Sequence, residues 1–468
     1  MSAGGTGAGG VSAGGARTGG AGAERDDVSG VEHPQQARTV GVLAASQVFS
    51  GIGNGAALAV GSLLAVQLSG NEALGGTTTM AISVAGALSA LPLARLALSR
   101  GRRQALMTAY ALATLGSVAM LLAPVVSSFP LLLAGAFGVG FGAAGNLQAR
   151  FAATDLASTR RRGQDLGLVV WSITIGAVAG PNLIGPGASI ARSVGLPETS
   201  GAFLFSTAGM VVAILILALG LRPDPLVLRR DLDTRGALPE AGVAGVRAAQ
   251  APQLRAGLRA VVEDSRILAG VASVVGAHAV MVGIMAMTPV HLARLAEHPL
   301  GGGAATVHAA STDTLVVIGL VISLHIAGMY ALSPLVGWAA DRWGRVRVIV
   351  AGHGVLIAAA VVGTGWGRST AAVTAALILL GIGWSLVTVA GSAYVSEHVA
   401  GARRVLVQGV TDAGMGAAAA VSAALAGVVL SAFGFAGLCV VAAVVAFALL
   451  AWMGSSGRAE RLMIGRRP

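Results

Sequence analysis

The chain has 468 residues, of which 55% are hydrophobic and only 11% are charged, and its mean hydropathy is +0.78. This composition leaves too little polar surface for a soluble globular protein and places the chain in lipid. The net charge of +11 comes from 31 basic residues, all of them Arg, in short runs between apolar stretches, which is typical of membrane topology and not of nucleic-acid binding. The single cysteine, Cys439, excludes a disulfide framework and a CxxC metal site within the chain.

The first 38 residues are rich in Gly, Ala and Ser and are predicted to form a disordered tail without a removable signal peptide. Twelve apolar stretches follow, each long enough to cross a hydrocarbon core of about 30 Å as a helix. The predicted spans are 40–68, 74–98, 103–124, 130–157, 165–189, 201–221, 267–292, 313–339, 346–365, 370–396, 405–432 and 434–455. The predicted fold is an all-α polytopic membrane protein.

Arginine-rich loops alternate along the chain with loops that carry almost no Arg. Because basic residues stay in the cytoplasm, this pattern predicts an even number of spans with both termini cytoplasmic, in a bacterial plasma (inner) membrane. Residues 222–266 contain eight Arg and are predicted to be a cytoplasmic linker with a surface helix over 253–264. The predicted organisation is a tail (1–38), a six-helix bundle (39–221), the linker (222–266), a second six-helix bundle (267–456) and a basic cytoplasmic tail (457–468).

Short motifs recur between the two predicted bundles at one offset of 243 residues. The repeated pairs are Gly101-Arg102 with Gly344-Arg345, Gly138-x-Gly140 with Gly381-x-Gly383, and Arg160-Arg161 with Arg403-Arg404. Two similar six-helix halves joined by a linker are typical of a transporter that rocks around a substrate bound between the halves near the bilayer midplane.

Residues 337–347, GWAADRWGRVR, resemble the loop signature G-x-x-x-D-R-x-G-R-x-R of the major facilitator superfamily. The resemblance implies a charge network that latches the two halves in the outward-facing state, with Glu397 at the end of the tenth span as a partner. The residues of this predicted latch are Gly337, Asp341, Arg342, Gly344, Arg345, Arg347 and Glu397.

The first-half copy of this signature is degraded, because Ala94 and Leu98 replace its first Gly and its Asp. Gly101, Arg102 and Arg103 remain, and Asp155 is predicted to pair with one of the two arginines. The alternative for both copies is that these charges only anchor the loops at the lipid headgroups.

The fifth predicted span resembles the antiporter signature G-x8-G-x3-G-P-x2-G-G of drug:proton exporters and lacks only the first Gly of the closing pair. The matching residues are Gly167, Gly176, Gly180, Pro181 and Gly185. We expect the small residues to let a neighbouring helix approach and Pro181 to bend the span. An ordinary glycine-rich packing face is the alternative. Residues 145–157 and 323–330 also resemble an actinobacterial group of uncharacterised, drug-exporter-like proteins.

Ionisable residues inside the spans are functional candidates, because a charge in lipid is costly. His278 and His325, in the seventh and eighth spans, are candidates to carry a coupled proton, and a hydrogen bond to a neighbouring helix is the alternative for each. Asp412 in the eleventh span either accepts a proton or belongs to the latch. Arg150 corresponds loosely to the fourth-span Arg of the family and completes the proton-coupling candidates.

Polar, aromatic and methionine side chains near these groups are the candidates to line a substrate cavity. They are Asn146, Gln148, Trp171, Thr174, Asn182, Met281, Met285, Thr288 and Met329. Trp171 would stack on a flat or cationic ligand, and its alternative is an interfacial anchor. Convergence of His278, Met281, Met285 and His325 would instead suit a soft metal or a metal chelate.

The sequence therefore predicts a proton-coupled exporter of small organic molecules or drugs that works by alternating access. The alternatives are an uptake symporter, a metal or siderophore exporter, and a non-transporting membrane sensor. The expected partners are protons, a small-molecule substrate and the lipid bilayer, with no nucleic acid, no resident metal and no cofactor, and the chain is expected to act as a monomer. No paired carboxylates, nucleotide loop or nucleophile–base spacing predicts an enzyme.

Overall fold

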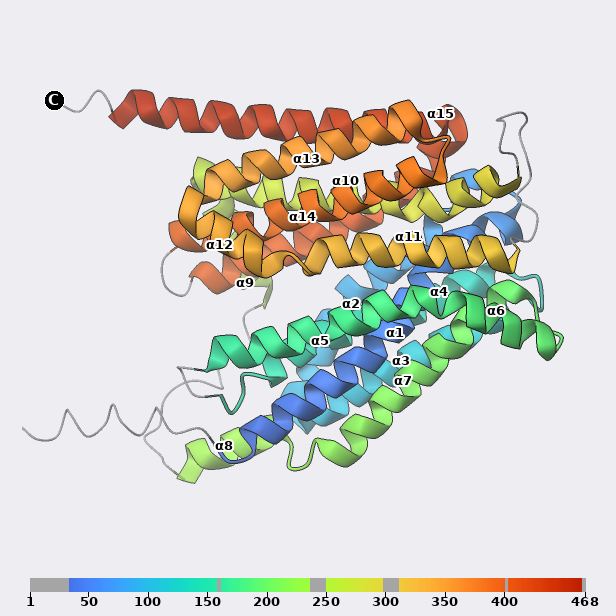
Figure 1. Cartoon of the computed structure of the whole chain (residues 1–468). Helices are drawn as coiled ribbons and strands as arrows, with labels where there is room; N and C mark the ends of the chain where they lie inside the picture. Colours follow the sequence, from blue (N-terminus) through green and yellow to red (C-terminus); the bar gives the residue numbers. More distant parts are fainter. Residues whose placement is uncertain (1–32, 158–160, 236–249, 298–310, 400–402, 465–468) are drawn as a thin grey trace, which may run out of the picture.

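The computed structural model describes residues 33–157, 161–235, 250–297, 311–399 and 403–464, and Figure 1 shows the arrangement of their helices. The first group of helices is α1 (Gln36–Ser69), η2 (Glu72–Leu74), α2 (Thr77–Arg100), α3 (Arg102–Leu122), α4 (Phe129–Ala152), α5 (Arg162–Asn182), α6 (Ile184–Ser193), η3 (Glu198–Ser200) and α7 (Gly201–Gly220). Within this group, here called the first half, α1 packs against α4, α5 and α7, while α3 and α4 pack together.

The second group is α10 (Ser265–Glu297), α11 (Thr312–Tyr330), α12 (Ser333–Trp343), α13 (Arg345–Trp366), α14 (Thr370–His398) and α15 (Arg403–Ile464). In this second half, α10 packs against α14 and α15, and α13 packs against α14. Two further helices, α8 (Pro225–Arg235) and α9 (Gln250–Glu263), lie between the halves in the sequence. The α9 helix matches the predicted surface helix, whereas α8 was not predicted.

Ten helices among the described residues are long and apolar enough to cross a membrane, and the bent pair α5 and α6 adds an eleventh span. Gly434, with a φ of 67°, divides α15 into two arms, so counting the arms separately gives twelve. The predicted boundary between the last two spans falls at this glycine. The second arm continues to Ile464, through most of the predicted basic tail. Residues 1–32 of the predicted N-terminal tail and 236–249 of the predicted linker lie outside the described residues.

Two spans are broken. The chain bends by 47° between α5 and α6, directly after Pro181, which removes one backbone donor from the helix. The predicted span over 313–339 lies within the candidate membrane span Thr312–Trp343, in which two turn residues, Ala331 and Leu332, separate α11 from α12. The signal for this break is Pro334 in the first turn of α12, where a missing N–H costs nothing.

The two ends of the bundle differ. One end of the bundle contains the start of α1 and the turns at Gly101 and Gly344, and we call it the basic end. We call the other end the opposite end. In Figure 1 the ribbons of the two halves diverge towards the basic end, on the left, where α8 and α12 are labelled. At the opposite end, α6 of the first half contacts α11 of the second, and η2 contacts α15. We call this joined region the seam.

Candidate functional site

Glycines bring backbone against backbone at the seam. A Cβ at Gly76, before α2, would collide with the carbonyl group of Ala423 in α15, and one at Gly319 in α11 would collide with the carbonyl oxygen of Pro181. A Cβ at Gly185 would likewise meet the side chain of Val316. At Gly76 and Gly319 the two halves therefore touch backbone to backbone.

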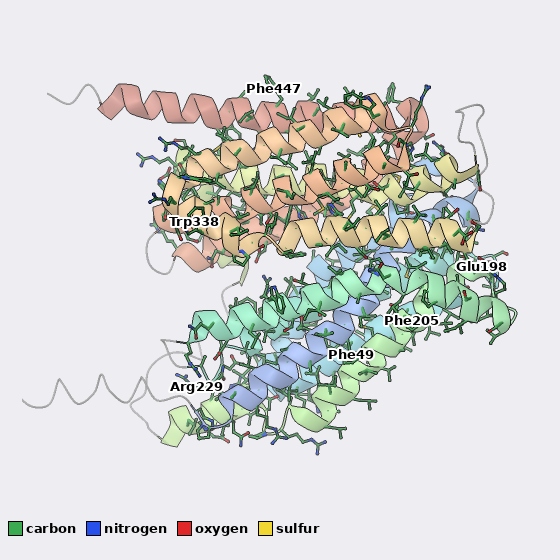
Figure 2. All side chains as sticks on the ribbon, in the orientation of Figure 1. Phe49, Glu198, Phe205, Arg229, Trp338 and Phe447 are labelled. Carbon is green, nitrogen blue, oxygen red and sulfur yellow. The ribbon has the colours of Figure 1, made fainter. Side chains whose placement is uncertain are left out.

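Charged side chains reinforce the seam. Arg294, near the end of α10, forms an ion pair with Glu72 of the first half. Glu198 accepts a hydrogen bond from the Thr312 hydroxyl at 2.6 Å and pairs with Arg192, whose guanidinium also contacts Thr312. Figure 2 shows Glu198 beside the start of α11. Arg192 and Arg294 belong to the predicted Arg-poor loops but lie in the last turns of α6 and α10, and their partners lie beside or across the seam.

Asn182, a predicted cavity residue, lies in the seam. Its amide donates to the Ser323 hydroxyl of α11 at 2.7 Å, and that hydroxyl donates to the carbonyl oxygen of Val178 at 2.8 Å. Trp171 lies about three turns earlier on the same face of α5 as Val178 and Asn182, and it is 53% exposed. Thr174 is buried. Of the three α5 candidates, Asn182 contacts the second half. Trp171 lies on the same face of α5 as Asn182 but nearer the basic end.

A polar group spans the two halves nearer the basic end. Arg150, in the last turn of α4, lies within Coulombic range of both Asp412 of α15 and Tyr330 of α11. Asp412 is an exposed residue, and Arg150 and Tyr330 are partly exposed. Two of the four proton-coupling candidates are thus electrostatically linked, and they come from different halves.

Three aromatic and imidazole rings extend this group within the second half. The indole of Trp384 in α14 donates to Nδ1 of His278 at 3.1 Å. The same indole packs edge-on against Tyr330, with ring centroids 5.7 Å apart. His278 therefore has a hydrogen bond to a neighbouring helix, which was the alternative to a role in carrying protons. Trp384 connects His278 to Tyr330.

The other second-half candidates lie in the packed interior. His325 is fully buried, its Nδ1 lies 2.7 Å from the carbonyl oxygen of Leu377, and its Nε2 has no hydrogen-bond partner among the described residues. Thr288 is buried and donates to its own helix. Met281 and Met329 are buried and Met285 is partly buried. His278 and His325 bind α14 residues that lie seven positions, about two turns, apart.

The first-half candidates Asn146 and Gln148 bind their own bundle. The Asn146 oxygen accepts from the Ser50 hydroxyl at 2.7 Å and from the Tyr110 hydroxyl at 2.9 Å. Tyr110 in turn accepts from Gln47 at 2.7 Å, so this buried network ties α1, α3 and α4 together. Both candidates are buried, with 8% of each exposed, which places them at the helix contacts of the first half.

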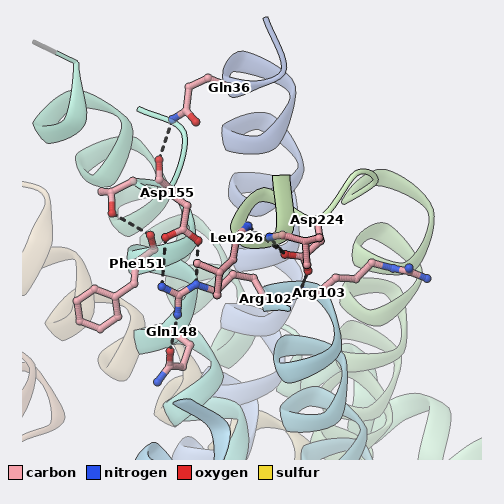
Figure 3. Close-up of polar contacts among 11 residues, drawn as sticks. Gln36, Arg102, Arg103, Gln148, Phe151, Asp155, Asp224 and Leu226 are labelled. Atoms are coloured by element: carbon pink, nitrogen blue, oxygen red, sulfur yellow. Dashed lines mark hydrogen bonds and ion pairs between the residues drawn. The ribbon is translucent and has the colours of Figure 1, made fainter. Parts of the chain in front are cut away.

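The first-half loop cluster is built around Arg102 (Figure 3). Arg102 donates to both carboxylate oxygens of Asp155, at 2.9 and 3.2 Å, and to the Gln148 side-chain oxygen at 3.1 Å. Burial raises the pKa of the Asp155 carboxyl, and the hydrogen bond and charge of Arg102 act in the opposite direction. Of the two predicted partners, Asp155 pairs with Arg102, while the backbone N–H of Arg103 binds Asp224 at 2.7 Å.

The second-half loop cluster is built around Arg345. Its guanidinium pairs with Glu397 at 2.9 Å, as predicted, and also with Asp341 one turn earlier. Arg347 donates to the carbonyl oxygen of Trp343 at 3.4 Å. Gly344 has a φ of 92° and makes the tight turn expected of it, and Arg342 is exposed. Gly337 does not lie at a close helix contact, because a Cβ there would have no neighbour within 4 Å.

The glycines of the fifth span have different surroundings. A Cβ at Gly176 would collide with the carbonyl oxygen of Val48 in α1, and one at Gly180 would lie 2.6 Å from that of Ile52. These two positions therefore let α5 approach α1, as expected. Gly167 does not, because a Cβ there would meet nothing within 4 Å.

Sequence reasoning missed Trp384, Tyr330, Asp224 and the Glu72–Arg294 pair. Trp384 and Tyr330 lie in apolar stretches where an aromatic residue is ordinary filler. Glu72 and Arg294 fall between the predicted spans, in segments that were interpreted only through their Arg content, although the structure places them in η2 and α10. A search for opposite charges at equivalent ends of the two halves would have suggested the Glu72–Arg294 pair.

Comparison with known proteins assigns a family. The model of the Major Facilitator Superfamily matches residues 43–312 and 302–461. The chain is 32% identical over 415 residues to the uncharacterized MFS-type transporter YdeG of Bacillus subtilis, covering 88% of this chain and 90% of that one. It is 25% identical over 381 residues to the riboflavin transporter RfnT of Brucella anthropi, covering 80% and 84%. The fold resembles that of the nucleoside transporter NupG, with a TM-score of 0.63 at 15% identity over 89% of this chain and 98% of that one.

Proposed function

This chain belongs to the Major Facilitator Superfamily and is therefore a secondary transporter, and from that premise we propose that it is a proton-coupled exporter of small organic molecules. The observation that carries the proposal is the position of Asp412, a carboxylate inside a predicted span of the second half, within Coulombic range of Arg150 at the end of α4 in the first half. The proton affinity of a carboxylate depends on nearby opposite charge. Rocking of the halves changes the separation of these two groups, so Asp412 binds its proton with different affinity in the two conformations, as proton coupling requires.

Two observations support export. Gly176, Gly180 and Pro181 match the exporter signature in sequence, and the glycines pack α5 against α1 next to the bend at Pro181. The Arg distribution favours a cytoplasmic basic end. With the halves joined at the seam and diverging at the basic end, this conformation then faces the cytoplasm, from which an exporter takes its substrate.

The rings around Arg150 favour a flat substrate. Trp384, Tyr330 and His278 form one contiguous group in the second half, and Trp171 is exposed on the α5 face that leads to the seam. Aromatic rings stack on planar ligands, and Arg150 beside Asp412 suits ligands that carry hydrogen-bonding groups. A riboflavin transporter among the relatives agrees with this chemistry. Transport of a planar heterocycle such as a flavin, in either direction, is thus the second candidate.

The experiment uses purified protein in liposomes with an imposed pH gradient. Cationic dyes, nucleosides and riboflavin are added in turn, and proton movement is followed with a pH-sensitive fluorophore. We expect at least one compound to dissipate the gradient, and we expect Asp412→Asn to abolish this coupling while leaving substrate exchange without a gradient. The matched control, Asp313→Asn, removes an exposed carboxylate at the start of α11, near the opposite end, and should keep the coupling.

Two results would overturn the assignment. If no compound moves protons although riboflavin or a nucleoside is transported, the coupling proposal fails and the second candidate or a facilitated carrier stands. If Asp412→Asn and Asp313→Asn both keep full coupling, the proton is carried by another group.

A further inference from the structure

Asp224 lies between the end of α7 and the start of α8, at the first residues of the segment that connects the halves. One oxygen of its carboxylate, Oδ2, accepts a hydrogen bond from the backbone N–H of Arg103 at 2.7 Å. The other oxygen, Oδ1, accepts from the N–H groups of Leu226 and Val227 at 3.0 and 3.2 Å. Figure 3 shows the carboxylate between the start of α3 and the start of α8.

One carboxylate thus caps two helices. The first N–H groups of any helix lack partners inside the helix, and the helix dipole makes that end attractive to a negative charge. Asp224 is the ordinary cap of α8, which begins at the next residue, and at the same time the cap of α3, which starts 122 residues earlier in the chain. Each oxygen serves one helix, so both oxygens are needed.

The first half lacks the acidic residue of the loop signature at just this turn. Leu98 stands where Asp341 stands in the second half, and Asp341 pairs with Arg345. Gly101, with a φ of 95°, lies so close to Asp224 that a Cβ there would collide with the carboxylate. The turn is therefore shaped around a carboxylate that comes from the connecting segment and not from α2.

We propose that Asp224 is a positioning residue that completes the first-half loop cluster from the linker. By fixing the backbone at Arg103, it holds the neighbouring Arg102 against Asp155 and Gln148. By capping α8 as well, it makes that helix a rigid part of the first half. The α9 helix belongs to the second half in the same way, because Gly257 packs on Leu406 and Val410 of α15. Each linker helix then moves with its own half when the transporter rocks.

Amide hydrogen exchange tests the two caps directly. In Asp224→Ala we expect the amides of Arg103, Leu226 and Val227 to exchange at least about tenfold faster, because each loses a charge-assisted hydrogen bond. Asp224→Asn keeps one acceptor oxygen and gains a donor, so it should release one helix start and keep the other. This second variant provides the test if Asp224→Ala does not accumulate.

A double-mutant cycle with Arg102→Gln tests the positioning role, which a simple helix cap would not show. If Asp224 acts through Arg102, the effects of Asp224→Asn and Arg102→Gln on the unfolding constant should fall short of additivity by at least about threefold. The matched control is Asp264→Asn, since Asp264 caps the start of α10 in the second half through the N–H of Arg266 at 2.8 Å. Its effect should add to that of Arg102→Gln.

The proposal is overturned if the Arg103 amide keeps its wild-type exchange rate in both Asp224 variants. It is equally overturned if Asp224→Asn and Arg102→Gln are as additive as the control pair. Neither measurement needs a transport substrate. The proposal for Asp224 can therefore fail while the proposed proton coupling stands, and the proton coupling can fail while the proposal for Asp224 stands.

Discussion

The two loop clusters occupy equivalent places in the two halves but are built differently. Arg345 binds two carboxylates, and all three side chains are open to solvent, with exposed fractions of 22% for Arg345, 70% for Asp341 and 51% for Glu397. Arg102 binds one carboxylate and one amide, and its pair with Asp155 is more shielded, at 15% and 11%. The sequence match is strong for the exposed cluster and poor for the shielded one.

A loop signature that has lost some of its residues can therefore still form a complete cluster of charged and polar contacts. The first half has lost the aspartate of the signature, yet Asp155, Gln148 and the capping oxygen of Asp224 surround the same turn. Removing one partner of a shielded ion pair destabilises the folded state more than removing one partner of an exposed pair. The reason is that the remaining charge stays poorly solvated. The shielded cluster should therefore matter more to the folded state, although its sequence is less recognisable.

The largest expected difference is between Arg102→Gln and Arg345→Gln. Removing Arg102 leaves a mostly buried Asp155 carboxylate and should lower the free energy of unfolding by about 3 kcal/mol. Removing Arg345 leaves two solvated carboxylates and should cost at most about 1 kcal/mol. Unfolding of both variants in mixed micelles with increasing SDS measures the difference. Equal losses would mean that shielding does not separate the two clusters.

A smaller difference is expected between Gly101→Ala and Gly344→Ala. Both glycines have positive φ angles, 95° and 92°, so alanine introduces backbone strain of about 1–3 kcal/mol at either position. At Gly101 the new Cβ also displaces Asp224, whereas at Gly344 it meets nothing within 4 Å. The Gly101 variant should lose about 1–2 kcal/mol more, the value of a helix cap. Thermal unfolding of the two variants side by side measures the difference, and equal losses would mean that Asp224 is displaced without cost.

The loss caused by Arg102→Gln should also depend on pH. Burial raises the pKa of Asp155 and Arg102 lowers it, so the pKa of this carboxyl should be higher in the variant, which lacks the effect of Arg102. A folded-state pKa above the unfolded value gives stability that is complete below the unfolded pKa and is lost as pH rises through the folded pKa. The deficit of the variant should thus be smaller in acid, where Asp155 is protonated, and should grow by about 1 kcal/mol as the pH rises through the folded-state pKa of Asp155 in the variant. A deficit that shrinks with rising pH contradicts this sign.

The smallest effect is the response to salt. At about 1 M salt the screening length falls to about 3 Å, so exposed pairs weaken while shielded ones change little. The deficit of Arg345→Gln should shrink by a few tenths of a kcal/mol, roughly the scale of a surface pair. That of Arg102→Gln should stay constant. Repeating the unfolding series with sodium chloride checks this, and a salt response in the Arg102 variant would contradict the shielding.

Sequence patterns predicted the parts of the molecule that repeat or follow a local rule. Apolar length predicted the spans, the loop signature predicted the Arg345–Glu397 pair, and Pro181 predicted the bend in the fifth span. The interpretation of Asp155 left open two arginine partners, and only the fold could decide between them. The physical reason is that helix length and proline chemistry act within a few residues, and sequence displays them directly.

The remaining parts depend on which helix faces meet. Gln148 was expected at a substrate cavity, but it turns towards the start of α3 and binds Arg102. Trp384 in an apolar stretch gave no sign that it would donate to His278. Asp224 lies 121 residues from its partner Arg103, and the linker around it has no repeat that would have linked the two. Such contacts follow from packing angles between helices, which a single sequence does not display.

The glycine-packed seam also bears on the electrical properties of the protein. Where Gly76 and Gly319 press against the carbonyl groups of Ala423 and Pro181, backbone atoms leave no room between them for a file of water molecules along which protons could leak. In this conformation no file of water passes between the backbones at these two contacts. Each unit charge that crosses a whole membrane gains or loses about 2.3 kcal/mol per 100 mV of membrane potential, and packed backbone of this kind is where such a potential can be held.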